Sequence, residues 1–283
     1  MKPVFLRLFF LFVCFGSMPF MASSQDLRCT YCFFKTRPDG KIEANMDMLL
    51  DLAEGKSAFY SETTFLRDSL RVKAFDSGGN IKDYDSYKRL TALPGYATKD
   101  FTCVDYHSGV FVQRYDDIVI VSGTGELEKP GWVLKDEFLE VFGFRCRRAE
   151  ANYFGRNWIV WFSEDIPCSA GPWLLYGAPG LILLAEDSER LIQFRMNGMQ
   201  KLTDNSRASF LSDFYDFLCP KVSRYKYDIR KCETFHTGFM SDPAVFDKVA
   251  GGRTTSIVDA KGNHISMSSM FSYTPIIPDE YWR

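Results

Sequence analysis

The sequence predicts a mainly β chain of the α+β class, built on a curved antiparallel sheet with a few helices packed on it. Two observations predict this class. Short runs rich in β-branched and aromatic residues recur between clusters of turn-forming residues. The chain also holds 26 Phe and 14 Tyr among 283 residues, enough to fill the face of a wide sheet. By analogy of strand pattern alone, this sheet could take the form of a half-barrel.

The chain is organised around residues 153–187, where two strand-like runs flank a turn-rich centre. Residues 158–162 and 181–184 are continuous apolar runs, which is typical of strands covered on both faces. Gly and Pro residues at 171–172 and 177–180 separate the two runs, and they constrain the backbone because Pro fixes φ while Gly permits positive φ. We therefore expect a rigid connection of special shape between two buried strands.

Three elements are expected before this stretch. Residues 46–53 alternate in a way that suits a strand, although their apolar residues also have helical spacing. A turn at Gly55 leads into a strand over residues 57–61. Residues 64–74 carry apolar residues among charges and predict a short helix, which ends in a loop at 76–80.

The segments on either side of the centre predict further strands. Residues 110–121 indicate a hairpin or one bent strand, and residues 132–134 indicate a strand after a turn. Residues 139–149 predict one strand. Residues 190–196 are expected to pair with 181–185 through a short turn, so this region is chiefly antiparallel.

Helices return in the last quarter of the chain. Ser206 can cap an apolar stripe over residues 206–218, which stops at Pro220. Residues 242–251 begin with Asp-Pro and end at Gly, the start and stop signals of a second helix.

The first 24 residues resemble a signal peptide. Lys2 and Arg7 precede an apolar run, and the small residues 22–24 offer a cleavage site. We expect an exported protein, in the periplasm or outside the cell, with no transmembrane segment after cleavage. The alternative is a membrane anchor, against which Gly16 and Pro19 interrupt the apolar run. The formal net charge of −2 gives no indication of a nucleic-acid partner.

Seven cysteines follow the signal peptide, and an oxidising compartment predicts disulfides between them. The odd number leaves at least one thiol unpaired within the chain. The pair Cys219–Cys232 spans a short loop and is the best local candidate. Cys29 and Cys32 have redox spacing, but no strand precedes them and no amphipathic helix follows, so they are interpreted as ordinary disulfide partners. The candidates are Cys29, Cys32, Cys103, Cys146, Cys168, Cys219 and Cys232.

Residues 177–182, Gly-Ala-Pro-Gly-Leu-Ile, are similar to the hallmark hexapeptide of the GLPGLI family, with Ala178 in place of Leu. Flanking motifs fall in the family's order over roughly residues 49–199. Members of this family are secreted proteins of bacteria with an outer membrane, and their biochemistry is unassigned. The resemblance implies export, favours the strand at 46–53, and implies a β-rich domain over 25–218. Residues 219–283 have no counterpart and are expected to form an extension packed on the same domain.

The resemblance also supplies candidate residues for a family motif or the rim of a ligand site. Arg156 needs a carboxylate partner if it is buried, and Glu164 or Asp165 could provide one across a turn. The aromatic excess indicates either a solid core or a cavity able to hold an apolar ligand. The candidates are Arg156, Trp158, Trp161, Pro167, Gly171, Pro172, Trp173, Gly177, Pro179 and Gly180.

Motifs that carry catalysis are scarce. The three histidines lie far apart in sequence, and neither a phosphate-binding loop nor a nucleophile elbow occurs. We therefore expect a non-enzymatic protein without a cofactor that binds an apolar small molecule, a lipid or an envelope protein. Two alternatives stay open. His264, Met267 and Met270 could hold a soft metal such as copper or iron, and a Cys/His pair could act as an enzyme.

Overall fold

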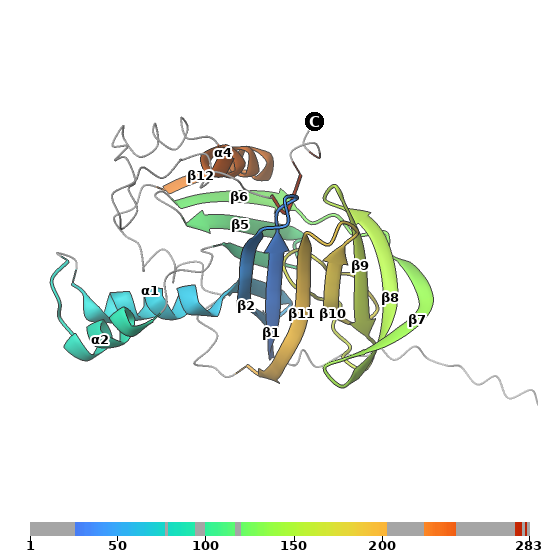
Figure 1. Cartoon of the computed structure of the whole chain (residues 1–283), viewed down its shortest axis with the longest axis horizontal. Helices are drawn as coiled ribbons and strands as arrows, with labels where there is room; N and C mark the ends of the chain where they lie inside the picture. Colours follow the sequence, from blue (N-terminus) through green and yellow to red (C-terminus); the bar gives the residue numbers. More distant parts are fainter. Residues whose placement is uncertain are drawn as a thin grey trace, which may run out of the picture.

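The computed structural model describes residues 26–76, 79–93, 100–116, 120–202, 224–241, 275–278 and 281. Within these residues, twelve strands form one open sheet (Figure 1), in the order β12-β6-β5-β4-β3-β2-β1-β11-β10-β9-β8-β7. Every neighbouring pair is antiparallel except β12 with β6. The mainly β, α+β class that the sequence predicts is therefore confirmed.

Two meanders build the sheet, and the first strand joins them. β1 pairs with β2 on one side and with β11 on the other, so segments far apart in the sequence lie side by side. The first meander comprises β1 (Leu27–Thr36), β2 (Ile42–Ala53), β3 (Lys56–Ser61), β4 (Phe101–Asp105), β5 (Val110–Asp116) and β6 (Ile120–Glu126). The second comprises β7 (Val133–Val141), β8 (Phe144–Tyr153), β9 (Arg156–Ser163), β10 (Leu181–Asp187) and β11 (Ile192–Lys201), and β12 (Arg224–Asp228) is added beside β6.

The sheet curves strongly. In Figure 1 strands β1, β11, β10 and β9 stand nearly upright, while β5 and β6 run nearly horizontally. Buried side chains from both groups belong to one core cluster, so one face of the curved sheet encloses the core. Large aromatic side chains fill this space. The rings of Trp158 and Phe194 stack with centroids 6.2 Å apart, and the buried hydroxyl of Tyr31 donates a 2.7 Å hydrogen bond to the carbonyl of Ile182. Curvature therefore leaves a core thick enough for rings rather than for aliphatic side chains alone.

Most predicted strands are confirmed, and one is wrong. The strands expected at 46–53 and 57–61 lie in β2 and β3. Residues 110–116 and 120–121 belong to two strands that pair antiparallel, β5 and β6, rather than to one bent strand. The single strand expected over 139–149 is instead the β7–β8 hairpin. Phe142 and Gly143 turn the chain with φ of 50° and 80°, and two successive residues of positive φ make the tight turn that suits twisted strands.

Three helices are described, of which the sequence predicted one. The helix expected at 64–74 is α1 (Glu62–Ala74), capped by the Ser61 hydroxyl, which accepts from the Thr64 amide. It packs against α2 (Tyr84–Ala92), and both extend away from the sheet at the left of Figure 1. The helices expected at 206–218 and 242–251, the signal peptide and Cys219 all lie outside the described residues.

Helix α4 (Ile229–Ser241) covers β6 at close range. A Cβ at Gly123 would overlap the side chain of Cys232, and one at Gly125 would overlap Phe111 and Ile229. The glycines of β6 thus let the helix approach the strand. None of the helices in the described part of the chain is both long and apolar enough to cross a membrane.

Candidate functional site

The connection from β9 to β10 is held by its own backbone. The amide of Gly177 donates to the Ser169 carbonyl over 2.7 Å, and the amide of Ile182 donates to the Ala170 carbonyl over 3.0 Å. Gly177 has a φ of 81°, and a Cβ on Gly180 would overlap the Ser163 carbonyl oxygen. The expected rigid link between two interior strands is confirmed, because β9 and β10 are direct neighbours inside the sheet.

A pocket of about 420 Å³ lies beside this connection. Three separate parts of the chain contribute to it: the end of β4, the segment before β7 and the β9–β10 connection. Its walls are mostly apolar or aromatic, with Lys129 as the charged residue of the lining. The lining residues are Tyr106, Lys129, Cys168, Ser169, Ala170, Tyr176 and Gly177.

Hydrogen bonds hold the two aromatic walls in place. The Tyr106 and Tyr176 rings lie 5.7 Å apart between centroids. A 3.0 Å hydrogen bond joins the Tyr106 hydroxyl to the Ser57 hydroxyl. The Trp132 indole N–H donates to the Tyr176 carbonyl over 2.8 Å, and the Tyr176 hydroxyl donates to the Leu127 carbonyl over 3.4 Å. Because both rings are tied to neighbouring strands and loops, the pocket is formed before any ligand arrives.

Apart from Lys129, the ionisable side chains that line the pocket are neutral at physiological pH. Burial raises the pKa of the Tyr106 hydroxyl and of the Cys168 thiol, and it raises the pKa of Tyr176 as well. Both phenols and the thiol therefore keep their protons. Lys129 is exposed, and it is the charged side chain among the described residues that line the pocket.

The candidate rim residues occupy different places. Gly177 lines the pocket, whereas Trp158 and Trp173 lie in the core, 1% and 3% exposed, with their rings 5.9 Å apart. Trp161 is half-buried. Gly171, Pro172 and Gly180 are buried in the connection, and Pro167 and Pro179 are exposed on it.

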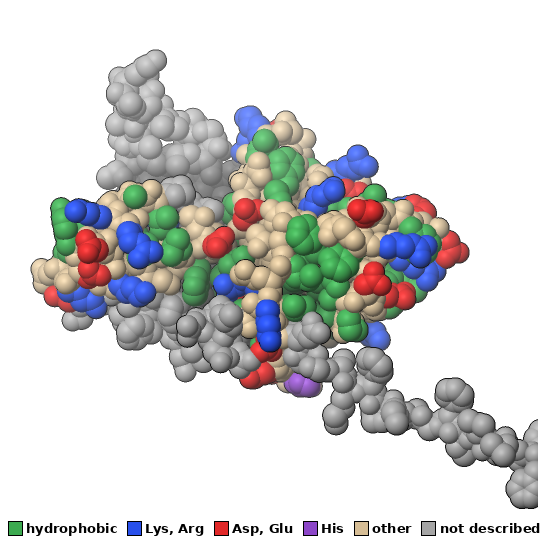
Figure 2. Space-filling model, turned by 90° about the horizontal axis from the view of Figure 1, so that it is seen from below, with side chains coloured by type: hydrophobic (Ala, Val, Ile, Leu, Met, Phe, Trp, Pro, Cys, Tyr) green, Lys and Arg blue, Asp and Glu red, His purple; other side chains and the backbone are tan. Residues whose placement is uncertain are grey.

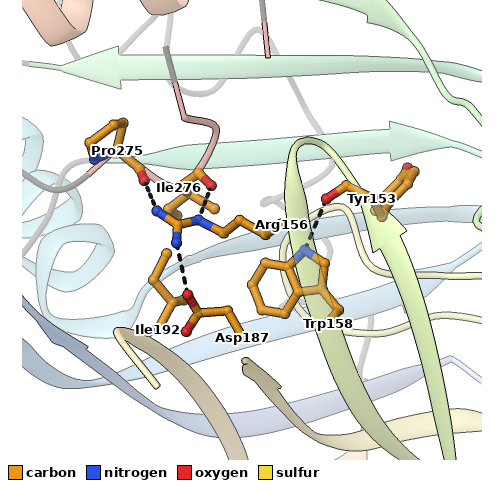
Figure 3. A network of polar contacts seen from close by, with 7 residues as sticks. All are labelled: Tyr153, Arg156, Trp158, Asp187, Ile192, Pro275 and Ile276. Atoms are coloured by element: carbon orange, nitrogen blue, oxygen red, sulfur yellow. Dashed lines mark hydrogen bonds and ion pairs between the residues drawn. The ribbon is translucent and has the colours of Figure 1, made fainter. Parts of the chain in front are cut away.

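Arg156 is buried, but its partner is not the one expected. Its Nη1 donates to Asp187 over 2.8 Å, whereas Glu164 and Asp165 are exposed at the far end of β9. Its Nε and Nη2 donate to the carbonyls of Ile276 and Pro275 over 2.7 and 2.6 Å (Figure 3). Since all three donor directions end on the protein itself, Arg156 fastens the 275–276 segment to the sheet.

The disulfides expected among the described cysteines are not formed. Cys29 and Cys32 are three residues apart on β1, so one points into the core and the other away from it. Cys232, the expected partner of Cys219, is a buried free thiol. The free thiols are Cys29, Cys32, Cys103, Cys146, Cys168 and Cys232.

Burial raises the pKa of all six described thiols above its ordinary value, which favours the protonated form. Burial raises the pKa of Cys29 to about 12 and the pKa values of Cys103 and Cys146 to about 11. Cys232 and His236 share a buried face of α4, where His236 stacks on Tyr115 with centroids 3.5 Å apart. Burial and nearby acidic groups raise the pKa of Cys232 as well, so this thiol is protonated rather than activated.

No candidate metal site is present among the described residues. No group of three or more His, Cys, Asp or Glu side chains there is placed to hold an ion. The soft-metal candidates His264, Met267 and Met270 lie outside the described residues.

Sequence reasoning missed most of the pocket. Tyr106, Lys129, Ser169 and Tyr176 were not singled out, and Cys168 was considered only as a disulfide partner. The available signal was the aromatic residues next to turn-forming glycines and prolines, at 106–109 and 176–180.

No family model and no curated protein matches the chain. Two crystal structures of PNGF-II, in space groups C2 and P21, are similar to it with TM-scores of 0.47 and 0.45 at 14% sequence identity. The matches cover 75% and 72% of this chain. The chain spans about a third of the matched chains, 32% in each case.

Proposed function

We propose that this chain is an exported, GLPGLI-like binding protein that holds a small apolar ligand in the pocket beside residues 168–177 and performs no chemistry on it. The pocket is the observation that carries the proposal. Its volume of about 420 Å³ lies within the range of small-molecule sites, roughly 300–1,000 Å³. Export is supported by the signal-like residues 1–24, and the family by the hexapeptide at 177–182.

The chemistry of the walls defines the ligand class. Two neutral phenol rings, Ala170 and the protonated Cys168 favour an aromatic or aliphatic body. Lys129 at the edge favours a ligand with one acidic group, since the exposed ammonium can pair with it without leaving water. We therefore expect a small amphiphile with an apolar body and an anionic end.

The fluorescent probe anilinonaphthalene sulfonate has this chemistry and tests the site. Ser169 is an exposed lining residue, so Ser169→Trp fills the pocket without entering the core. Its backbone carbonyl, which holds Gly177, is unchanged by the substitution. The matched control is Glu164→Trp, an exposed residue of the same connection that lines a second pocket, beside Arg145 and Arg147, and not this one.

We expect the wild type and Glu164→Trp to bind the probe with equal affinity. Ser169→Trp should weaken binding by about ten-fold or more, because the indole takes the place of the probe. Equal binding by all three proteins would show that the probe sits elsewhere, and it would overturn the proposal.

A further inference from the structure

The outer edge of β7 exposes an unusual number of apolar side chains. β7 ends the sheet, and no strand of the described residues pairs with its outer edge. Val133, Leu134, Phe138 and Leu139 are between 39 and 57% exposed on this strand, and Phe142 in the following turn is 47% exposed. Exposed apolar edges favour pairing with another strand, and natural proteins usually block them with charges or proline.

The register with β8 shows which of these side chains share a face. Leu134 pairs with Ala149 and Phe138 pairs with Arg147, two residues apart on β8. Leu134 and Phe138 therefore lie on one face of the sheet, since alternate residues of a strand share a face. By the same reasoning, Val133 and Leu139 lie on the other face, opposite Glu150 and Cys146.

Residues 133–139, Val-Leu-Lys-Asp-Glu-Phe-Leu, are complementary to themselves when two copies run antiparallel about Asp136. Leu134 then faces Phe138 of the other copy on one side of the sheet, and Val133 faces Leu139 on the other side. Lys135 and Glu137, which pair within the chain with Glu150 and Arg148, also come opposite each other, so opposite charges meet twice. Apolar residues thus meet apolar residues, and a base meets an acid, in a single register.

Two features of the strand are compatible with this register. The pairing of β7 with β8 shifts register between Leu134 and Phe138. Both copies carry the same irregular segment centred on Asp136, so Leu134 of one copy still lies opposite Phe138 of the other. At the symmetry axis Asp136 would lie opposite Asp136 of the other copy. Each of these carboxylates is already paired with Arg147 of its own chain over 2.7 Å. Figure 2 shows side chains of both signs at the end of the molecule where β7 and β8 lie.

We propose that the outer edge of β7 is a dimer interface at which a second copy of this chain pairs antiparallel about Asp136. The pairing is isologous, so the same edge serves both subunits and no free edge is left at this end of either sheet. The proposal is independent of the pocket, which is formed by other residues.

The register can be tested at two exposed residues of β7, of which Phe138 also carries the Arg145 guanidinium over its ring at 3.8 Å. Leu134→Lys and Phe138→Glu each place one charge against an apolar side chain of the other copy. Combined in one chain, they place Lys opposite Glu twice. Ile42→Lys is the control, because Ile42 is 63% exposed on β2 and away from β7.

Sedimentation velocity measures the outcome over a concentration series. We expect dimers for the wild type, for Ile42→Lys and for the double variant. Each single variant should dissociate with a dissociation constant raised about ten-fold or more, because an unpaired charge is brought against apolar surface. A wild type that is monomeric at every concentration contradicts the proposal. This holds also if the monomer binds a different peptide at this edge. A double variant as weak as its two parents also contradicts it.

Discussion

Arg156 and Asp187 form a buried ion pair, with Nη1 and Oδ2 2.8 Å apart, and this pair joins the beginning of β9 to the end of β10. Asp187 also accepts the Ile192 amide through its other oxygen, over 2.8 Å. Arg156 also donates hydrogen bonds to the backbone carbonyls of residues 275 and 276. One side chain therefore ties two strands, a turn and a distant segment together.

Replacing Arg156 with Ala should destabilise the fold by about 3–5 kcal/mol, because it leaves the Asp187 carboxylate buried without its charged partner. Urea unfolding measures the change in the free energy of unfolding. Arg190→Ala is the matched control, since Arg190 is 76% exposed and lies 4.0 Å from Glu186. An exposed pair of this kind contributes at most about 1 kcal/mol. Equal losses in the two variants would refute a structural role for the buried pair.

The second prediction concerns the contact between Arg156 and residues 275–276. A chain that stops before Pro275 should lose stability, because the Nε and Nη2 groups lose their carbonyl acceptors. Arg156→Ala should then cost less in the shortened chain than in the full chain. The double-mutant cycle should give a coupling of about 0.5–3 kcal/mol. Additive effects would mean that the segment is held by other contacts.

Buried thiols predict a dependence of stability on alkaline pH. The folded state raises the pKa of Cys29 from an ordinary value of 9.0 to about 12. Between these values the unfolded chain releases this proton and the folded chain keeps it. Stability should therefore be highest below pH 9 and fall as the pH rises toward about 12. Cys29→Ala should show a shallower fall than the wild type when urea midpoints are compared across this range. Parallel curves would contradict the assignment.

Gly180 provides a test of the rigid connection. Gly180→Ala brings a Cβ against the Ser163 carbonyl, and the overlap forces β9 and β10 apart. We expect a loss of about 1–3 kcal/mol, the usual cost of overpacking. The control is Pro179→Ala at the neighbouring exposed position, which should cost less than about 1 kcal/mol. Thermal unfolding of the two variants, each against the wild type, gives the comparison.

The elements that neighbouring residues alone determine were predicted correctly from the sequence. Residues 158–162 and 181–184 are apolar runs of strand length, and the Gly and Pro residues between them marked the connection correctly. The turn at Phe142 was missed because an aromatic residue at positive φ leaves only Gly143 as a signal. The helix α2 was missed although Asp83 is a good N-terminal cap, accepting from the Asp85 amide.

Properties that depend on distant segments were not predictable. The partner of Arg156 is set by the register of β9 with β10, which places Asp187 opposite Trp158 and so next to the arginine. The pocket is set by the curvature of the sheet, which brings Tyr106 to within ring-stacking distance of Tyr176. The disulfide expectation failed for the same reason, because spacing along the chain does not show which face of a strand a cysteine occupies.

The most direct test of the central claim is native mass spectrometry of protein isolated from cells that produce it. The account predicts that the wild type and Glu164→Trp retain a small organic molecule with an acidic group, and that Ser169→Trp retains none. If the wild type carries no bound molecule, or if Ser169→Trp carries the same one, the pocket beside residues 168–177 is not a ligand site.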